Sequence, residues 1–447
     1  MTDKPAQRKE KAIPSSRFSR VSRLGALAGK IAGNVVTQGA SQLLKGEKPV
    51  LSSLLLTPRN ISNIADQLAS MRGAAMKLGQ LISMDAGDFL PPELAAILGR
   101  LREDADPMPK AQLVEVLDNA WGAKWQADLL YFSFAPIAAA SIGQVHKIIT
   151  MDGRMLAVKV QYPGVKKSID SDVDNVATLI RLSGLVPKSL NISPLLEEAK
   201  QQLHQEADYE REASMLQRYN MALASDPTLS SLPFVLPEVY PPLTSHNVLA
   251  MDFIEAQSLD ALLSEPQDVR NAMMTALMTL FFNEIFNFRL LQSDPNLGNY
   301  KYQKDHQKIV LLDFGATREV PQHIAHSYQT LLKSIKENDR NTMQATAYDI
   351  GLIDSNHNNA QIEAVIDIGM EACEAIRHNG AYDFGKSDLI HRLHDKGIAL
   401  TTEHDFWHTP PVDALFIHRK LAGLFLLAKR LGACVDMQST ATKWLSN

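Results

Sequence analysis

The feature that most constrains the fold of this chain is a pair of short polar loops in its second half. In the first loop, Asp294 is followed five positions later by Asn299, and in the second, an apolar run ends in Asp313-Phe314-Gly315. Two carboxylates and an amide oxygen in this order can hold Mg²⁺ and orient a hydroxyl or a water molecule for attack on a phosphate. Each loop alone is a weak signal, but their order and spacing together are hard to obtain by chance.

The two loops follow the pattern of the catalytic loop and the magnesium-binding loop of protein kinases. In that pattern Asp294 orients the attacking hydroxyl or water, while Asn299 and Asp313 hold Mg²⁺. The first loop begins with Gln292-Ser293 where most protein kinases have His-Arg, and no Ala-Pro-Glu follows the second loop. The first loop is therefore supported differently, and a standard platform for a peptide substrate is in doubt.

A strand-rich stretch upstream supplies the lysine that such a site needs. Strands are predicted over residues 141–149 and 155–160, joined by the hairpin turn Met151-Asp152-Gly153. The second strand contains Leu156-Ala157-Val158-Lys159, which matches the Val-Ala-Ile-Lys pattern in which an inward lysine meets nucleotide phosphates. Lys159 is therefore assigned to the phosphates.

The turn before this lysine is rich in alanine where a kinase has a glycine-rich phosphate loop. The nucleotide is expected against Ala138, Ala139, Ala140 and Ser141. Alanine resists positive φ and places a methyl group where glycine would let the backbone approach a phosphate. We therefore expect the nucleotide to be held differently from ordinary kinases.

Two further elements complete the predicted nucleotide site. The lysine needs a glutamate partner on a helix. A long helix beginning at Ser193 carries the acids Glu197, Glu198, Glu206, Asp208, Glu210 and Glu212. Their spacing does not decide which of them pairs with Lys159. The apolar strand 248–254 suits a hinge between lobes, with adenine bound by the backbone from Asp252 to Ile254.

Most of the second half of the chain is predicted to be helical. The run from Arg270 to Leu291 is apolar nearly all round, as expected of a helix buried within a lobe, and it leads directly into the first polar loop. Further helices are predicted near Val320–Glu337, Thr342–Ile350, Gln361–Arg377 and Ala414–Leu431.

The distribution of charge bears on the partners of the chain. A net charge of -5 over 447 residues argues against a protein that coats nucleic acid, yet residues 1–50 are strongly basic. From Phe18 to Val35, apolar residues recur every three or four positions, with Arg20, Arg23 and Lys30 mostly on another side. This basic amphipathic helix could lie on an anionic membrane or pack on the protein, and both readings stay open.

Cysteine content and hydropathy indicate the compartment. Only Cys373 and Cys434 are present, without Cys/His ligand spacing, so neither a disulfide framework nor a zinc site is suggested. The N-terminus has no secretory signal, and the longest apolar segment, residues 271–283, is too short to span a bilayer. We expect a soluble or peripheral protein in a reducing compartment.

Taken together, these motifs resemble the UbiB family, the AarF-domain or ADCK-type atypical kinases. The similarity runs from about residue 17 to the C-terminus. The matching pieces are Lys77-Leu78-Gly79-Gln80 for the family's Lys-x-Gly-Gln motif, Ala138-Ala139-Ala140-Ser141 for its alanine-rich loop, Lys159 for its phosphate lysine, Glu206-Ala207-Asp208 with Glu212 for its Glu-x-Asp segment and helix glutamate, and Asp294, Asn299 and Asp313 for its loops.

The resemblance implies an α+β fold with the two lobes of a protein kinase, a small antiparallel β lobe and a large helical lobe. It adds an N-terminal helical extension packed over the active site, in which Lys77 and Gln80 form a regulatory lid that reaches toward Glu206 and Asp208. It also implies that Glu212 is the partner of the phosphate lysine. On this basis the chain divides into a basic segment with the amphipathic helix (1–50), the extension (51–128), an N-lobe (129–252) and a C-lobe (253–447).

The resemblance further implies a role in ubiquinone (coenzyme Q) biosynthesis through ATPase or unorthodox kinase activity, with ATP or ADP and Mg²⁺ as cofactors. Implied partners are an anionic membrane surface, quinone-lipid precursors or their biosynthetic enzymes, and a second copy in a homodimer. The last residues of the sequence, Lys443–Asn447, are polar as a group, unlike the ends of family members that have C-terminal transmembrane helices. We expect a bacterial cytoplasmic protein peripheral on the inner membrane, with a mitochondrial location left open. Two alternatives remain, a true protein kinase acting on a peptide and a non-catalytic nucleotide-binding scaffold that presents lipids.

Overall fold

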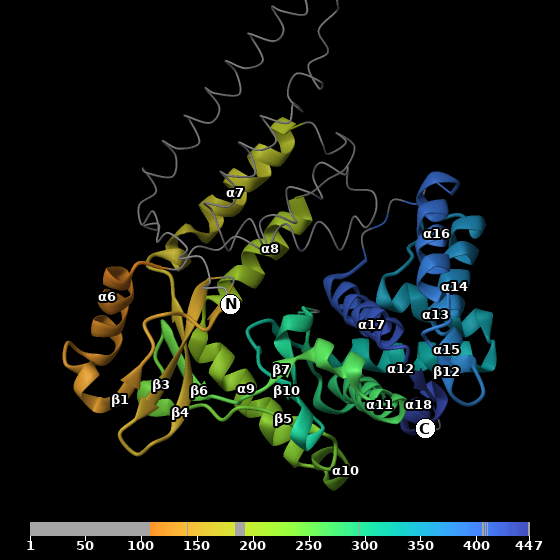
Figure 1. Cartoon of the computed structure of the whole chain (residues 1–447). Coiled ribbons are helices and arrows are strands. Elements are labelled where there is room, and N and C mark those ends of the chain that lie inside the picture. The colour runs from red at the N-terminus through yellow and green to blue at the C-terminus, as the bar shows by residue number, and fades with distance from the viewer. Residues whose placement is uncertain are drawn as a thin grey trace, which may run out of the picture. The chain divides into compact units, whose positions relative to one another are not determined.

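The structure is a computed structural model that describes residues 108–140, 142–183, 193–294, 296–404, 406, 408 and 410–445 (Figure 1). The chain divides into two compact units. The first unit consists of the chain up to Ala213 together with the later segment Glu238–Phe253. The second unit consists of Ser214–Pro237 and the chain from Ile254 onward. The predictions for Lys77, Gln80 and Ser141, and for the basic amphipathic helix, lie outside the described residues.

The first unit is built on a five-stranded sheet whose neighbouring strands all run antiparallel. Its order is β1-β3-β4-β6, with β2 also paired to β3. The strands are β1 (Leu129–Phe132), β2 (Ala138–Ala139), β3 (Gly143–Thr150), β4 (Met155–Gln161) and β6 (Val248–Asp252). The predicted turn joins β3 to β4, and Gly153 supplies the positive φ of 84° that this turn requires.

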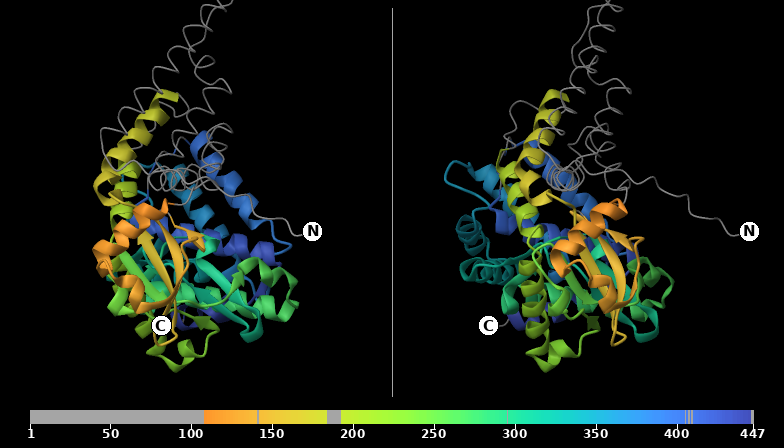
Figure 2. Two further views of the ribbon diagram at one scale, coloured as in Figure 1. Left: turned by 60° about the vertical axis from the view of Figure 1, so that its left-hand side comes forward. Right: turned by 90° about the vertical axis from the view of Figure 1, so that its left-hand side faces the viewer.

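Helix α6 (Lys110–Trp121) packs against this sheet and closes its core (Figure 2). Leu113 and Leu117 of α6 are buried in one apolar cluster with Ile148 of β3 and Val158 of β4. Residues four apart lie on the same face of a helix, so α6 turns one apolar face to the sheet. Each such buried side chain contributes about 1.5–3 kcal/mol to the stability of the unit. The core therefore fixes β4, the strand that carries Lys159.

Three helices follow the first hairpin, and the last two take the place of the single long helix predicted from Ser193. They are α7 (Val165–Ser183), α8 (Ser193–Glu206) and α9 (Tyr209–Ala224). The predicted helix is interrupted at Ala207-Asp208. Oδ1 of Asp208 accepts a hydrogen bond of 3.0 Å from the backbone N–H of Arg211, and aspartate favours this capping position over a helix interior. The side chain of Gln161 donates to the carbonyl oxygen of Ala207 at 2.9 Å, so β4 also holds the interruption in place.

In the second unit, the buried helix predicted from Arg270 to Leu291 is shorter than expected. Helix α11 spans Gln267–Asn283 and continues as one π-helical turn over Glu284–Phe288. Arg289 then adopts a left-handed conformation with φ 51°, which a right-handed helix does not accommodate. The last predicted residues form strand β8 (Leu290–Gln292), paired with β11 (Thr317–Glu319). The prediction is wrong there because a short apolar run does not distinguish a buried strand from a buried helix.

A four-stranded sheet of the second unit presents the second polar loop. Its order is β5-β10-β9-β7. The strands are β5 (Phe234–Val235), β7 (Gln257–Ser258), β9 (Tyr300–Gln303) and β10 (Lys308–Leu311). The short helical turns among the described residues of both units are η2 (Trp125–Asp128), α10 (Pro227–Ser230), η3 (Pro241–Leu243), η4 (Leu259–Ser264), η6 (Leu297–Asn299) and η7 (Lys304–His306). Because β10, an inner strand of this sheet, ends two residues before Asp313, this residue lies just beyond the end of a strand that is paired on both sides.

Helices make up most of the remaining described chain. They are α12 (Gln322–Glu337), α13 (Arg340–Ile350), α14 (Asn359–Ala372), α15 (Glu374–Arg377), α16 (Leu389–Thr402), α17 (Val412–Leu431) and α18 (Met437–Leu445), with β12 (Tyr382–Asp383) paired to β13 (Cys434–Val435). The helices predicted for this part are confirmed, with one of them divided at Cys373. Among the described residues, no helix combines the length and the apolar character needed to cross a membrane.

The two cysteines are both free thiols, and we expect them to differ in reactivity. Cys373 is 8% exposed, and burial raises the pKa of its thiol to about 12, whereas Cys434 is half-buried. At pH 8 only about one Cys373 thiol in ten thousand would be ionised, and the thiolate is the reactive form. A thiol reagent at pH 8 should therefore modify Cys373 at least about a hundredfold more slowly than Cys434. Labelling followed by peptide mass spectrometry checks this, with the Cys434→Ser protein as the control, and equal rates would contradict it.

Candidate active site

Lys159 lies on β4 and forms an ion pair with Glu212 of α9. The distance from Lys159 Nζ to Glu212 Oε1 is 2.5 Å, and the two side chains are 8% and 4% exposed. A buried pair of this kind is weak evidence for stability, because taking both charges out of water costs about as much as their contact returns. Its effect is positional, since the carboxylate holds the ammonium group in one place. Among the six acids that spacing left open, Glu212 is the one that the resemblance implies.

The alanine-rich loop forms a tight hairpin on the same sheet. Ala138 and Ala139 are exposed and pair with β3, and the N–H of Ala140 donates to the carbonyl oxygen of Gly143 at 3.0 Å. None of these three alanines has a positive φ. A Cβ at Gly143 would lie 2.3 Å from the carbonyl oxygen of Val160, so the hairpin has no room for a larger residue there. This alanine backbone therefore lies one strand away from Lys159, because β3 pairs with β4.

Glu206 and Asp208, which were expected to face the lid, lie at the junction of α8 and α9. Glu206 is buried and Asp208 is half-buried. Possible ligand atoms of Asp208, Glu210 and His246 all lie within 4.8 Å of one another. The junction thus concentrates negative charge, which would attract a lysine side chain. Because the residues of the lid itself lie outside the described chain, the lid stays a prediction.

Asp252, expected in the hinge, ends β6 and is anchored within the first unit. Its Oδ1 accepts a hydrogen bond from Arg154 Nη2, and its Oδ2 accepts one from the N–H of Glu238, both at 3.1 Å. The backbone N–H groups of Asp252 and Phe253 donate to carbonyl oxygens of neighbouring segments. These two amides are therefore used inside the unit, while Ile254 belongs to the second unit. The adenine contact by this backbone stays a prediction.

In the second unit, the loop with Asp294 is organised by its own side chains. Oδ1 of Asp294 accepts a hydrogen bond of 3.1 Å from the N–H of Asn296. The side-chain oxygen of Asn296 in turn accepts a hydrogen bond of 2.9 Å from the N–H of Gly298. The backbone carbonyl oxygen of Asn296 accepts one from the N–H of Asn299. Such side-chain bonds to the following backbone define Asx turns. These bonds hold the backbone of the loop that joins Asp294 to Asn299 in one conformation.

The two polar loops are joined by several hydrogen bonds. The N–H of Leu312 donates to the carbonyl oxygen of Asn299 at 3.0 Å. The side chain of Gln292 donates a hydrogen bond to the backbone carbonyl oxygen of Asp313. The hydroxyl of Ser293 donates one of 2.6 Å to the backbone carbonyl oxygen of Ala316. Gln292 and Ser293 are each 1% exposed. They therefore provide, by direct bonds to the second loop, the different support that was expected where most protein kinases have His-Arg.

Asn299 and Asp313 fit the role of Mg²⁺ ligands by their chemistry, because Mg²⁺ prefers carboxylate and amide oxygens. Oδ1 of Asp313 accepts a hydrogen bond of 3.0 Å from the N–H of Gly315, which orients the carboxylate. Nδ2 of Asn299 is buried and has no hydrogen-bond partner among the described residues. The two ends of an asparagine amide have the same shape, so rotating the amide by half a turn puts Oδ1, a ligand for Mg²⁺, in that place.

A buried polar network beneath these loops was not predicted from the sequence. Oε1 of Glu284, in the π-helical turn, accepts hydrogen bonds from the hydroxyl of Tyr219 at 2.7 Å and from the N–H of Gln292 at 3.1 Å. Its other oxygen, Oε2, forms an ion pair with Lys420 of α17. The ring of Tyr219 packs on Phe314, with centroids 5.0 Å apart. The network therefore supports the first residue of the first loop and the middle residue of Asp313-Phe314-Gly315.

Burial dominates the electrostatics of this network. Glu284 is 0% exposed, and burial raises the pKa of its carboxyl although Lys420 and two hydrogen bonds act in the opposite direction. Burial likewise lowers the pKa of Lys420 and raises that of Tyr219. The sequence signal that could have found Glu284 is a single acid inside an otherwise apolar helical run, whereas Lys420 directly follows His418 and Arg419 and gives no such signal. π-Helical turns such as the one at Glu284 are frequent at functional sites.

Comparisons with known proteins agree with this geometry. A family model described as the ABC1 atypical kinase-like domain matches residues 100–347. The chain is 35% identical over 430 residues to Atypical kinase COQ8, mitochondrial, of Saccharomyces cerevisiae, covering 96% of this chain and 84% of that one. It is also 35% identical over 438 residues to Atypical kinase COQ8B, mitochondrial, of Rattus norvegicus, covering 96% and 81%. The solved structure of Rv3197 from Mycobacterium tuberculosis with erythromycin has a TM-score of 0.57 and 21% identity, covering 94% of this chain and 98% of that chain.

These likenesses confirm the predicted α+β kinase-like fold, for which the sheet of the first unit and the helices of the second are the direct evidence. They also confirm the predicted enzyme class, an atypical kinase or ATPase of the kind that the COQ8 proteins represent. A fold of this class implies that a nucleotide is bound. The chain belongs to the ABC1 atypical kinase-like family, the UbiB or AarF-domain family that its motifs predict.

Proposed function

We propose that this chain is an ATP- and Mg²⁺-dependent atypical kinase or ATPase that supports the biosynthesis of ubiquinone or a related quinone lipid. The observation that carries the proposal is the buried ion pair of Lys159 and Glu212. A protein that only needed a stable fold would gain little from burying two charges. A protein that binds nucleotide phosphates needs an ammonium group held in one position.

The described residues divide the chemistry among them. Lys159, held by Glu212, neutralises the phosphates, and Asn299 and Asp313 hold Mg²⁺, which when bound supplies charge stabilisation at the transferred phosphoryl group. Asp294 orients the hydroxyl or the water molecule that attacks, and its own position is set by the Asx turn of the first loop. ATP and ADP are both candidates for the nucleotide at the alanine-rich hairpin.

The acceptor is proposed to be water or a small lipid-linked hydroxyl rather than a peptide serine. The second loop is not followed by the Ala-Pro-Glu segment that anchors a peptide platform. The family resemblance adds a lid formed by Lys77 and Gln80 over the space that a peptide would need. Quinone-lipid precursors carry phenolic hydroxyl groups, and these precursors or their biosynthetic enzymes are the proposed partners.

We propose that this activity takes place at an anionic membrane surface, with the basic helix predicted between Phe18 and Val35 as the contact. Each Lys or Arg close to such a surface contributes about 1 kcal/mol, so Arg20, Arg23 and Lys30 would together change binding by about a hundredfold. The yeast and rat relatives are named as mitochondrial proteins. The inner leaflet of a bacterial membrane and the mitochondrial inner membrane both fit this part of the proposal.

A turnover assay with vesicles tests the function. The full-length protein should release phosphate from ATP in the presence of Mg²⁺, and anionic vesicles containing a soluble phenol should raise the rate several-fold, whereas neutral vesicles should not. The triple variant Arg20→Ser, Arg23→Ser, Lys30→Ser should keep the basal rate and lose the stimulation, because it loses three charges from the predicted helix.

A matched variant separates the helix from a general loss of charge. Lys4→Ser, Lys9→Ser, Lys11→Ser removes three positive charges outside the predicted helix and should retain the stimulation. Equal stimulation of all three proteins would remove the membrane helix from the proposal. Nucleotide binding without any turnover would instead favour the lipid-presenting scaffold, and phosphate found on a peptide in stoichiometric amounts would favour a true protein kinase.

A further inference from the structure

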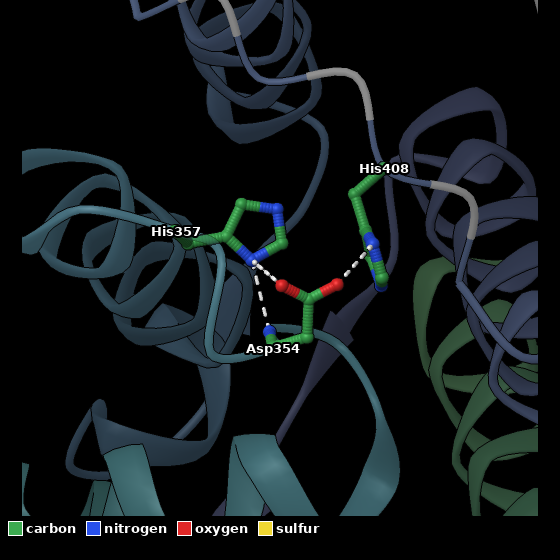
Figure 3. A group of neighbouring side chains, drawn as sticks. All are labelled: Asp354, His357 and His408. Atoms are coloured by element: carbon green, nitrogen blue, oxygen red, sulfur yellow. Dashed lines mark hydrogen bonds and ion pairs between the residues drawn. The ribbon is translucent and has the colours of Figure 1, made fainter.

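A group of three side chains away from the kinase loops has the composition of a metal site (Figure 3). Asp354 and His357 lie in the connection between α13 and α14, and His408 lies ahead of α17. Their possible ligand atoms all lie within 4.8 Å of one another. The side chains of His357 and His408 are 11% and 19% exposed, and that of Asp354 is 43% exposed. The group is therefore sheltered yet reachable by an ion from solvent.

Hydrogen bonds determine which imidazole nitrogens carry a lone pair. Nε2 of His408 lies 2.8 Å from the carbonyl oxygen of Gly351, so this nitrogen bears the proton and donates it. The lone pair of His408 is then on Nδ1. In His357, Nδ1 accepts a hydrogen bond of 2.9 Å from the backbone N–H of Asp354, so the lone pair is again on Nδ1. Both Nδ1 atoms face the carboxylate of Asp354 (Figure 3).

The distances match those between ligands of one small divalent ion. His357 Nδ1 lies 3.2 Å from Asp354 Oδ1, and His408 Nδ1 lies 3.7 Å from Asp354 Oδ2. Ligands about 2.0–2.1 Å from a tetrahedral Zn²⁺ are about 3.3 Å from one another. Two lone pairs and a carboxylate at these distances repel unless a proton or a metal cation lies between them. The bond from His408 to Gly351 is also the kind of outer contact that orients a metal-bound histidine.

We propose that Asp354, His357 and His408 form a second metal site that takes Zn²⁺ or another transition metal of similar size, independent of the Mg²⁺ loops. The chemistry selects the metal class, because imidazole nitrogen suits zinc-like ions while Mg²⁺ and Ca²⁺ prefer oxygen ligands throughout. Three protein ligands leave a fourth position for water. On binding, the ion takes the lone pair of His357 Nδ1 in place of the Asp354 amide, so a small adjustment of this turn accompanies binding.

The site would tie the turn after α13 to the segment before α17. The ring of Phe406 packs at a tilt against the ring of His357, with ring centroids 4.4 Å apart, and covers one side of the group. Sequence spacing alone did not indicate this site, because His408 is distant in the chain from the other two ligands. Helix α17 carries Lys420, so an ion here would anchor the start of the helix that supports Glu284.

Cobalt binding tests the proposal with the full-length chain. After removal of metal by a chelator, Co²⁺ should bind with one equivalent that shows the visible absorption of a four-coordinate site. The test is done on the Asp313→Asn protein, which lacks the carboxylate of the Mg²⁺ loop. In this background, His408→Gln and the near-isosteric Asp354→Asn should each weaken Co²⁺ binding at least about tenfold.

His391→Gln is the matched control, because His391 is exposed on α16 beside another histidine and an aspartate. It should bind Co²⁺ like the parent, and circular dichroism should show that all variants are folded. Zn²⁺ should also raise the thermal unfolding temperature of the parent and of His391→Gln but not of Asp354→Asn. The proposal is overturned by the absence of a one-equivalent site, by unchanged binding in both His408→Gln and Asp354→Asn, or by loss of binding in His391→Gln.

Discussion

Replacing Asp313 by asparagine is expected to lower the rate of ATP turnover by about a hundred- to a thousandfold while the fold stays intact. The asparagine keeps an oxygen that can accept the hydrogen bond from the N–H of Gly315, so the turn is preserved. What is lost is the negative charge that is proposed to hold Mg²⁺ against the phosphates. Losing one preorganised electrostatic group at a transferring centre typically costs this factor in rate. Phosphate release at saturating ATP and Mg²⁺ measures the effect.

The control for this prediction is Asp305→Asn, which makes the same change at an exposed acid in the turn η7 of the same unit. Its rate should stay within about twofold of wild type, because exposed charges far from the phosphates are screened. An Asp313→Asn protein as fast as the wild type would show that the second polar loop does not hold the catalytic metal. Binding of a fluorescent nucleotide, measured in parallel, separates a defect in chemistry from a defect in binding.

Local patterns in the sequence predicted the parts of the site that are made within one short segment. The hairpin of β3 and β4 follows from strand periodicity and a turn with glycine, and it places Lys159 on an inward-facing position of β4. The two polar loops are likewise single segments with fixed spacing. Such features depend on backbone geometry over a few residues, which sequence spacing encodes directly.

Features that depend on contacts between distant segments were missed or misjudged. The break at Asp208 needs a side-chain cap and a bond from β4, and the strand β8 needs its partner β11, which lies beyond both polar loops. The choice of Glu212 among six acids came from the family resemblance, because helix spacing alone does not decide which of them pairs with Lys159. Glu284 and Lys420 are far apart in the sequence, and no local pattern around either residue identifies the other as its partner.

Replacing Lys420 by methionine is expected to destabilise the second unit by about 3–5 kcal/mol, because it leaves the buried carboxylate of Glu284 without its counter-ion. Methionine has nearly the shape of the lysine stem, so the loss is electrostatic rather than one of packing. Hydrogen exchange of residues 284–292 measures the local effect, since the N–H of Gln292 is bonded to Glu284. Lys429→Met makes the same change at an exposed position of α17 and should alter stability by no more than about 0.5 kcal/mol.

A double-mutant cycle decides whether the loss of stability in Lys420→Met comes from breaking the ion pair with Glu284. In Glu284→Gln with Lys420→Met, neither position of the pair carries a charge, and the glutamine oxygen can still accept hydrogen bonds from Tyr219 and from the N–H of Gln292. The double variant should therefore be more stable than Lys420→Met alone, with a coupling of about 0.5–3 kcal/mol. Additive effects would show that Lys420 acts through packing. Because Gln292 also bonds to Asp313, restored stability should restore turnover in parallel, which would tie the buried pair to the position of the second polar loop.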